Sequence, residues 1–213
     1  MPLDPLPYDK HLTDTLDALA DRGWAVDHTL FDADLIAALR ASCEARWQAG
    51  AFHAAAVGRA VNEARREDIR SDAVLWLDES DSDPAVAAYF QRMDVVRQAV
   101  NQTLYLGLAE LETHFATYPE GAFYKKHLDR FRDDDARTLT AVLYLNPDWP
   151  ADAGGQMRLY LDEACTQHLD IPPEAGTLVL FLSDRFWHEV RPTHQPRMAV
   201  TGWFRRRIGP MPW

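Results

Sequence analysis

Residues 197–206, RMAVTGWFRR, form the clearest strand pattern in the chain. Because side chains alternate between the two faces of a strand, Arg197 and Thr201 share one face, and Met198 and Val200 share the other. From about residue 110, six similar runs of strand formers precede this one: LETHFATY (111–118), FYKKHLD (123–129), LTAVLYLN (139–146), QMRLYLD (156–162), TLVLFL (177–182) and HEV (188–190). Turn residues separate the runs, so the pattern predicts a β-sandwich or barrel.

Helical spacing dominates the first half of the chain. Three leucines on one helical face precede Gly23, and an apolar stripe predicts a second helix at about residues 33–48. Asp83, as the N-cap before Pro84, predicts the start of a third helix. We expect these helices to pack on the outside of a sheet.

Together these patterns predict one domain over residues 1–213. The fold class is mainly β with supporting helices, and its core is a double-stranded β-helix of the jelly-roll or cupin-like kind. We expect the helical support at about residues 1–110 and the β core at about 111–207. Ligands then belong in the mouth of the barrel.

The composition disfavours several classes of protein. A chain of 213 residues with 47% hydrophobic side chains can bury a substantial core. Its net charge of -11 disfavours a protein that binds nucleic acid by neutralising phosphates. Two cysteines without a CxxC pair indicate neither a disulfide framework nor a thiolate zinc site. No stretch has the pattern of a leader or a membrane span, so we expect a cytoplasmic protein without membrane or nucleic-acid partners.

His127 and Asp129 lie two residues apart in a predicted strand, so both side chains leave the same face. An HxD pair alone is weak evidence, because such pairs arise often by chance. His188, which begins another predicted strand, can provide a third ligand. Two imidazoles and one carboxylate are the ligands of non-haem Fe(II) oxygenases, and they leave three adjacent metal positions open. A chelating 2-oxo acid can take two of these positions and dioxygen the third.

Arg197 shares its strand face with Thr201, and an inward-facing arginine needs an anion. The far carboxylate of 2-oxoglutarate can accept two parallel hydrogen bonds from a guanidinium, with the Thr201 hydroxyl nearby. The alternative is a strand-end arginine that pairs with a carboxylate of the protein itself.

The other histidines lack a partner of this kind, and we interpret them as surface or hydrogen-bonded core residues: His11, His28, His53, His114, His168 and His194. His194 is the nearest alternative third ligand, but it lies in the turn PTHQP. The acidic run Asp133–Asp135 is interpreted as a solvated loop and not as a second metal site.

Residues 57–72, VGRAVNEARREDIRSD, are polar, charged and weakly periodic. Two interpretations stay open: a lid that closes over a bound peptide, or a solvated surface loop. The same choice applies to five arginines, which either meet a polar peptide or are solvated: Arg59, Arg65, Arg66, Arg70 and Arg137.

Several segments resemble one family, the prolyl-hydroxylase branch of the 2-oxoglutarate oxygenases. Over roughly residues 111–207 the similar motifs are HLD (127–129), LYLN (143–146), the glycine pair (154–155), WHEV (187–190) and RMAVTGWF (197–204). DIRSDAVLWLD (68–78) resembles the strand after the substrate-covering loop of the hypoxia-inducible-factor prolyl hydroxylases. FYKKHLDRFRDDD and the terminal WFRRR are similar to bacterial members in particular.

The resemblance implies a role for each residue of the predicted site. It implies three ligands of Fe(II): His127, Asp129 and His188. It implies three residues that hold the side-chain carboxylate of 2-oxoglutarate: Arg197, Tyr144 and Thr201. It implies two tyrosines that line the pocket: Tyr118 and Tyr124.

The resemblance also implies the reaction. A prolyl residue of a protein is hydroxylated while 2-oxoglutarate and O2 become succinate and CO2, with ascorbate as a candidate reductant. For the bacterial relatives the expected substrate is elongation factor Tu. Two alternatives stay open: an oxygenase for a small molecule such as a free amino acid, and a non-catalytic barrel that binds a metabolite or metal as a sensor. A peptide enzyme needs an open groove and a small-molecule enzyme a closed pocket.

Overall fold

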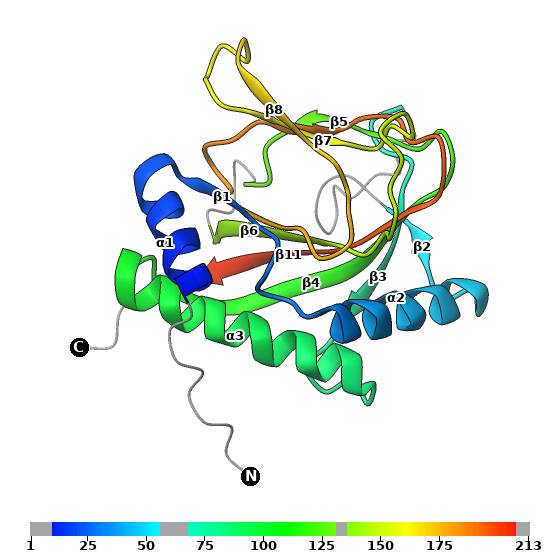
Figure 1. Ribbon diagram of the computed structural model, residues 1–213, viewed down its shortest axis with the longest axis horizontal. Coiled ribbons are helices and arrows are strands. Elements are labelled where there is room, and N and C mark those ends of the chain that lie inside the picture. The colour runs from blue at the N-terminus through cyan, green and yellow to red at the C-terminus, as the bar shows by residue number, and fades with distance from the viewer. Residues whose placement is uncertain (1–9, 56–67, 131–135, 208–213) are drawn as a thin grey trace.

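The computed structural model describes residues 10–55, 68–130 and 136–207, and its strands form two antiparallel sheets that face each other (Figure 1). The order in the larger sheet is β1 (Trp24–Asp27), β9 (Leu178–Leu182), β6 (Arg137–Tyr144), β11 (Arg197–Arg206), β4 (Leu108–Tyr118), β3 (Ala73–Leu77) and β2 (His53–Ala54). The order in the smaller sheet is β5 (Tyr124–His127), β10 (His188–Val190), β7 (Met157–Tyr160) and β8 (His168–Ile171). The predicted jelly-roll fold is confirmed.

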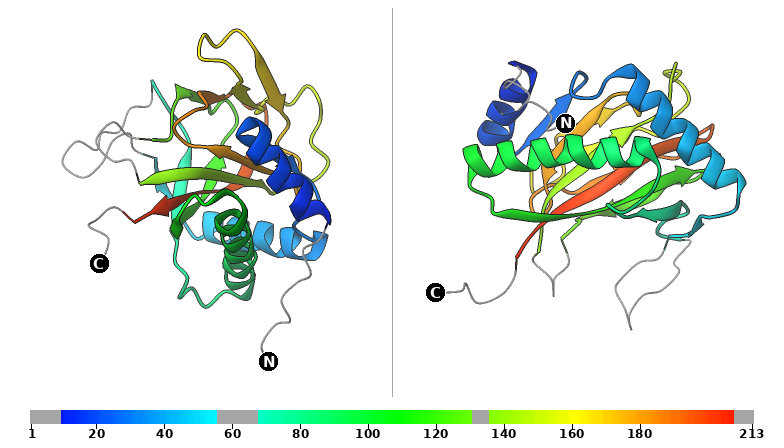
Figure 2. Two further views of the ribbon diagram at one scale, coloured as in Figure 1. Left: turned by 90° about the vertical axis from the view of Figure 1, so that its left-hand side faces the viewer. Right: turned by 90° about the horizontal axis from the view of Figure 1, so that it is seen from below.

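Helices cover the outer face of the larger sheet (Figure 2): α1 (Lys10–Arg22), α2 (Ala33–Gln48) and α3 (Pro84–Leu104). The Asp32 carboxylate caps α2 by accepting a hydrogen bond from the Leu35 N–H at 2.8 Å. Asp83 caps α3 in the same way, as predicted, from the Ala85 N–H at 2.8 Å. Gly23 ends α1 at φ +83°, a conformation that favours glycine. In the described ranges, no helix is both long and apolar enough to cross a membrane.

The main hydrophobic core lies between these helices and the larger sheet. Leu39 on α2, Met93 on α3 and Phe115 on β4 are completely buried there. Met198 and Val200 of β11 belong to the same core, as their strand alternation predicts. The opposite face of β11 is turned toward the smaller sheet, so the space between the two sheets is available for polar residues.

Three strands from the first half of the chain also belong to the larger sheet. β1 pairs with β9, β3 pairs with β4, and β2 pairs with β3. The segment expected as helical support, at about residues 1–110, thus also contributes strands to the larger sheet. These strands cover the backbone N–H and C=O groups that β9 and β4 would otherwise expose as sheet edges.

Candidate active site

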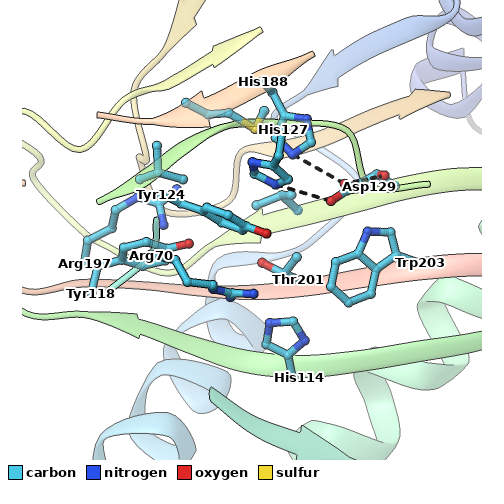
Figure 3. Close-up of a pocket in the computed structure, with 14 residues that line it drawn as sticks. Arg70, His114, Tyr118, Tyr124, His127, Asp129, His188, Arg197, Thr201 and Trp203 are labelled. Carbon is cyan, nitrogen blue, oxygen red and sulfur yellow. Dashed lines mark hydrogen bonds and ion pairs between the residues drawn. The ribbon is translucent and has the colours of Figure 1, made fainter. Parts of the chain in front are cut away.

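A pocket lies between the two sheets, and polar side chains from both of them point into it (Figure 3). The smaller sheet and the turn after it contribute the predicted metal ligands, and β4 and β11 of the larger sheet form the opposite wall. The lining residues are Arg70, His114, Tyr118, Tyr124, His127, Asp129, Thr140, Val142, Met157, His188, Val190, Arg197, Thr201 and Trp203.

The three predicted metal ligands meet in this pocket. His127 ends β5 and His188 begins β10, and the two residues are direct cross-strand partners. Asp129 follows β5 by two residues, with its Oδ1 atom 3.5 Å from His127 Nε2 and its Oδ2 atom 3.4 Å from His188 Nε2. The three ligand atoms lie within 4.8 Å of one another. This spacing suits a single ion between them.

The protonation of the three side chains also fits a cation. The Nδ1 atom of His127 lies 2.8 Å from the Lys125 carbonyl, and that of His188 lies 3.2 Å from the Phe186 carbonyl. A carbonyl can only accept, so both Nδ1 atoms donate, and the two Nε2 atoms are the ring nitrogens that face Asp129. Burial lowers the pKa of His188 to about 4, which keeps its ring neutral. Burial alone raises the pKa of Asp129, but the imidazoles of His188 and His127 outweigh it and hold the carboxyl ionised.

Arg197 lies at the other end of the pocket, and its surroundings fit an anion. Its side chain is only 2% exposed, and its Nε atom donates to the Gly155 carbonyl at 2.9 Å. The guanidinium carbon lies 4.7 Å from the ring centre of Tyr118 and 4.9 Å from that of Tyr144. No carboxylate in the described part of the chain pairs with Arg197. The alternative of a strand-end arginine with a carboxylate of the protein as its partner is therefore wrong there.

The hydroxyl of Tyr144 adds a second unsatisfied group beside Arg197. It is buried and has no hydrogen-bond partner within residues 10–55, 68–130 and 136–207. Burial raises the pKa of Tyr144, so the phenol keeps its proton and can donate it. A buried cation without a counter-charge and a buried donor without an acceptor are costly, and a carboxylate between them would satisfy both. The residues present therefore fit the far end of 2-oxoglutarate.

Comparisons with known proteins identify the family. Residues 113–205 match the sequence profile of the 2OG-Fe(II) oxygenase superfamily. The chain is also 44% identical to a prolyl-4-hydroxylase from Pseudomonas putida, whose crystal structure superposes with a TM-score of 0.84 over 92% of this chain and 100% of that one. This chain belongs to the 2OG-Fe(II) oxygenase superfamily. The family predicted from the sequence motifs is confirmed.

Two further relatives of this oxygenase are described as prolyl hydroxylases. A prolyl hydroxylase from Trichoplax adhaerens, solved with a peptide fragment of the hypoxia-inducible factor oxygen degradation domain, is 26% identical with a TM-score of 0.82, over 91% of this chain and 88% of that one. The hypoxia-inducible factor prolyl hydroxylase of Caenorhabditis elegans is 32% identical over 197 residues, which are 88% of this chain and 27% of that protein. The oxygenase thus spans about a quarter of that curated relative.

A chain of buried hydroxyls holds the carboxylate of the candidate metal centre. Thr140 on β6 donates its hydroxyl proton to Asp129 Oδ2 at 2.8 Å. The Ser183 hydroxyl lies 2.9 Å from the Thr140 oxygen and, since the Thr140 proton is already used, donates to it. Both hydroxyl residues are completely buried. These two hydrogen bonds fix the position of Asp129 Oδ2. Thr140 on β6 therefore orients the carboxylate toward the two imidazoles.

Replacing Thr140 by valine, which keeps the shape and removes the hydroxyl, should weaken metal binding by about 10- to 100-fold. The measurement is the Kd for Fe(II) without oxygen, or for Mn²⁺ as a stable substitute. Thr138→Val is the matched control on the same strand, because the Thr138 hydroxyl bonds only to the Ala136 carbonyl. Equal affinities for the Thr140 variant and the control would show that Asp129 needs no support from the hydroxyl.

The glycine pair noted in the sequence lies against Arg197 and allows its backbone to approach that side chain. Gly154 and Gly155 have φ angles of +67° and +68°, in the left-handed region. A Cβ atom on Gly154 would lie 2.3 Å from the Pro192 carbonyl oxygen, and one on Gly155 would lie 3.2 Å from Arg197 Cδ. Only glycine therefore lets this segment approach the strand beside Arg197.

Gly154→Ala should lower the free energy of unfolding by about 3 kcal/mol, from backbone strain and the clash with Pro192 together. Gly121→Ala is the control, because Gly121 has φ +81° but open space around its Cβ position. The control should lose only about 1 kcal/mol, the cost of the left-handed backbone. Denaturant unfolding of both variants measures the difference, and equal losses would show that the segment can move away from Pro192.

Arg70 lies in the pocket, which excludes the interpretation of a solvated arginine. Its Nε and Nη2 atoms donate to the two carboxylate oxygens of Asp72 at 2.7 and 2.6 Å. Its guanidinium lies 4.3 Å from the ring centre of Tyr124, which stacks on His127 at 3.6 Å. Tyr124 lines the pocket, as predicted. The stack of Arg70 on Tyr124 and of Tyr124 on His127 holds the His127 ring in place. The spacing of Arg70 and Asp72, two residues apart before a predicted strand, was the available signal.

Two further residues differ from their sequence interpretation. Arg137 is not solvated: it is 9% exposed, pairs with Glu112, and lies 3.5 Å from the ring centre of Trp203. His114 is neither a surface residue nor a hydrogen-bonded core residue, because it is 3% exposed and its Nδ1 atom has no partner. Position on a strand face could have suggested His114, because it shares the parity of Tyr118 on the same strand.

The remaining predictions fall outside the site or outside the described residues. His194 stays in its turn, with Nδ1 2.8 Å from the Asp152 carbonyl, and does not belong to the metal cluster. The acidic run at 133–135 and most of the predicted lid, residues 57–67, lie outside the described residues.

Proposed function

We propose that this oxygenase is an Fe(II)- and 2-oxoglutarate-dependent prolyl 4-hydroxylase that acts on a prolyl residue of a protein. The observation that carries the proposal is one pocket with two unsatisfied ends. At one end His127, Asp129 and His188 present three ligand atoms within 4.8 Å. At the other end Arg197 is buried without a carboxylate partner among the described residues. A cation site and an anion site that line the same pocket suit 2-oxoglutarate bound to iron.

When bound, iron and 2-oxoglutarate supply the oxidation of an unactivated C–H bond by O2, with succinate and CO2 as products. The chain itself binds and orients. His127, Asp129 and His188 would hold the metal, and the ligand set of two imidazoles and one carboxylate would leave coordination positions for 2-oxoglutarate and O2. Arg197, Tyr144 and Thr201 would hold the far carboxylate, and the apolar lining residues Val142, Met157 and Val190 would limit the access of water. We assign ascorbate no site of its own.

A protein substrate is favoured by the relatives. The Pseudomonas putida neighbour is a prolyl-4-hydroxylase, and the Trichoplax neighbour was solved with a peptide in complex. We propose elongation factor Tu as the substrate, on the resemblance of FYKKHLDRFRDDD and WFRRR to bacterial members. Such a substrate requires the enzyme to be in the cytoplasm.

The test is succinate formation with Fe(II), 2-oxoglutarate and O2, in the presence of elongation factor Tu, of free proline, or of neither. The proposal expects the protein to stimulate succinate formation and to gain the mass of one oxygen atom on a proline. Stimulation by free proline alone would favour the small-molecule oxygenase. Binding of 2-oxoglutarate without any succinate would favour the sensor barrel.

A further inference from the structure

His114 is a buried polar residue of the pocket that belongs to neither the metal centre nor the Arg197 end. On β4 it pairs with Thr201 of β11 on one side and with Trp76 of β3 on the other. It is 3% exposed and lines the pocket (Figure 3). Its Nδ1 atom is buried and has no hydrogen-bond partner among the described residues. A buried donor or acceptor that stays unpaired in a native protein is uncommon and points to a ligand.

Two tryptophans hold the imidazole in place. The centre of the Trp76 ring lies 4.9 Å from the centre of the imidazole, in an edge-on arrangement, and the centre of the Trp203 ring lies 5.4 Å from it. Trp203 lines the pocket, whereas Trp76 is 49% exposed. The row Trp203, His114, Trp76 therefore leads from the inside of the pocket to the surface at the β3 side of the sheet. A substrate peptide that reached the metal centre along this row would pass over the His114 ring.

The charges around His114 select the kind of group it can meet. Arg70 and Arg137 face it from the segment before β3 and from β6, with Asp129 and His53 as the other titratable groups nearby. Burial and the two arginines lower the pKa of His114 to about 3, so its ring is neutral and carries one N–H. A neutral N–H donor in a positive environment suits an acceptor oxygen that carries no proton, such as a carbonyl oxygen.

A prolyl residue offers such an oxygen and little else. Proline has no backbone N–H, so its own carbonyl and that of the preceding residue are the polar backbone groups beside the reacting ring. An enzyme that recognises proline by its backbone must therefore provide donors. The free imidazole N–H of His114 is such a donor, at the wall opposite the metal ligands (Figure 3).

We propose that His114 is a substrate-binding residue that donates a hydrogen bond to a backbone carbonyl oxygen next to the target proline. This inference rests on the proposed prolyl hydroxylase function and adds the group that orients the peptide. The exposed Trp76 then gives the flanking residue of the peptide an apolar surface. The bond orients the prolyl ring over the metal centre without taking part in its chemistry.

The test compares His114→Met, which keeps the bulk and removes the donor, with His114→Gln, which keeps an N–H. His168→Met is the matched control, because His168 is exposed on β8. The probes are capped synthetic peptides, each with one central proline, that together cover the prolines of elongation factor Tu. The measurements are kcat/KM for the peptides, KM for 2-oxoglutarate, and succinate formation without peptide.

His114→Met should lower kcat/KM for the peptide by about tenfold, the effect of one hydrogen bond. Succinate formation without peptide and the KM for 2-oxoglutarate should stay within about twofold of the wild type, and His114→Gln should recover most of the loss. Unchanged peptide kinetics in His114→Met would overturn the inference. So would equal losses in the Met and Gln variants, or a parallel loss of the peptide-independent reaction.

A second measurement needs no variant of the enzyme. Replacing either carbonyl beside the proline by a thioamide, a weaker acceptor, should lower kcat/KM of the wild type at one of the two positions. Equal kcat/KM values for the unmodified peptide and the two thioamide peptides would contradict the proposed hydrogen bond. A wild type that hydroxylates neither the peptides nor the intact factor would refute the proposed function itself, whereas an active wild type with an unaffected His114→Met variant refutes only the role of His114.

Discussion

Replacing Asp129 by alanine should abolish 2-oxoglutarate turnover while the protein stays folded. Asp129 is the only carboxylate of the described metal cluster, and its oxygens lie 3.5 and 3.4 Å from the two imidazole nitrogens. Without it two neutral imidazoles remain, which bind Fe(II) weakly. The sheets are held by apolar faces on both sides of the pocket, so the melting temperature should change little. Alanine at His127 or His188 should have the same effect.

The measurements are succinate formation, the Kd for Fe(II) under anaerobic conditions, and circular dichroism on heating. Asp170→Ala is the matched control, since Asp170 lies on β8 and pairs with Arg158 away from the pocket. The control should keep wild-type turnover. Full iron affinity and turnover in the Asp129 variant would show that a different residue provides the carboxylate.

Replacing Arg197 by alanine should raise the KM for 2-oxoglutarate at least about thirtyfold. Removing one partner of a buried, hydrogen-bonded charge pair costs about 2–5 kcal/mol, and 2 kcal/mol already corresponds to that factor. Lysine should not restore binding, because it lacks the planar fork that meets both carboxylate oxygens. Metal affinity should remain, since Arg197 and the metal ligands belong to opposite ends of the pocket.

The thermal shift on adding 2-oxoglutarate gives an independent measure, because at a fixed ligand concentration the stabilisation of the fold increases with the logarithm of the affinity. The wild type should melt at a higher temperature with 2-oxoglutarate and metal, and the Arg197 variant should show almost no shift. Arg158→Ala, at a half-buried arginine of β7 that pairs with Asp170 and does not line the pocket, is the control and should shift like the wild type. A normal shift in Arg197→Ala would place the carboxylate elsewhere.

The amino-acid sequence by itself determined the local structure and half of the site. The helix at Ala33–Gln48 and the cap at Asp83 followed from residue spacing, because helical and extended periodicity are properties of neighbouring residues. The same local rule put His127 and Asp129 on one side of a strand. It also put Arg197 and Thr201 on one face of β11, and that face lines the pocket.

Only the tertiary structure decided which distant residues complete the pocket. His188 reaches His127 because β10 pairs with β5, and the separation of 61 residues between positions 127 and 188 is one that no local period encodes. Arg70 and His114 were misjudged for the same reason. Whether a polar side chain is solvated or buried depends on the strands packed over it, here β4, β11 and the segment before β3, and such packing is set by contacts between residues far apart in the chain.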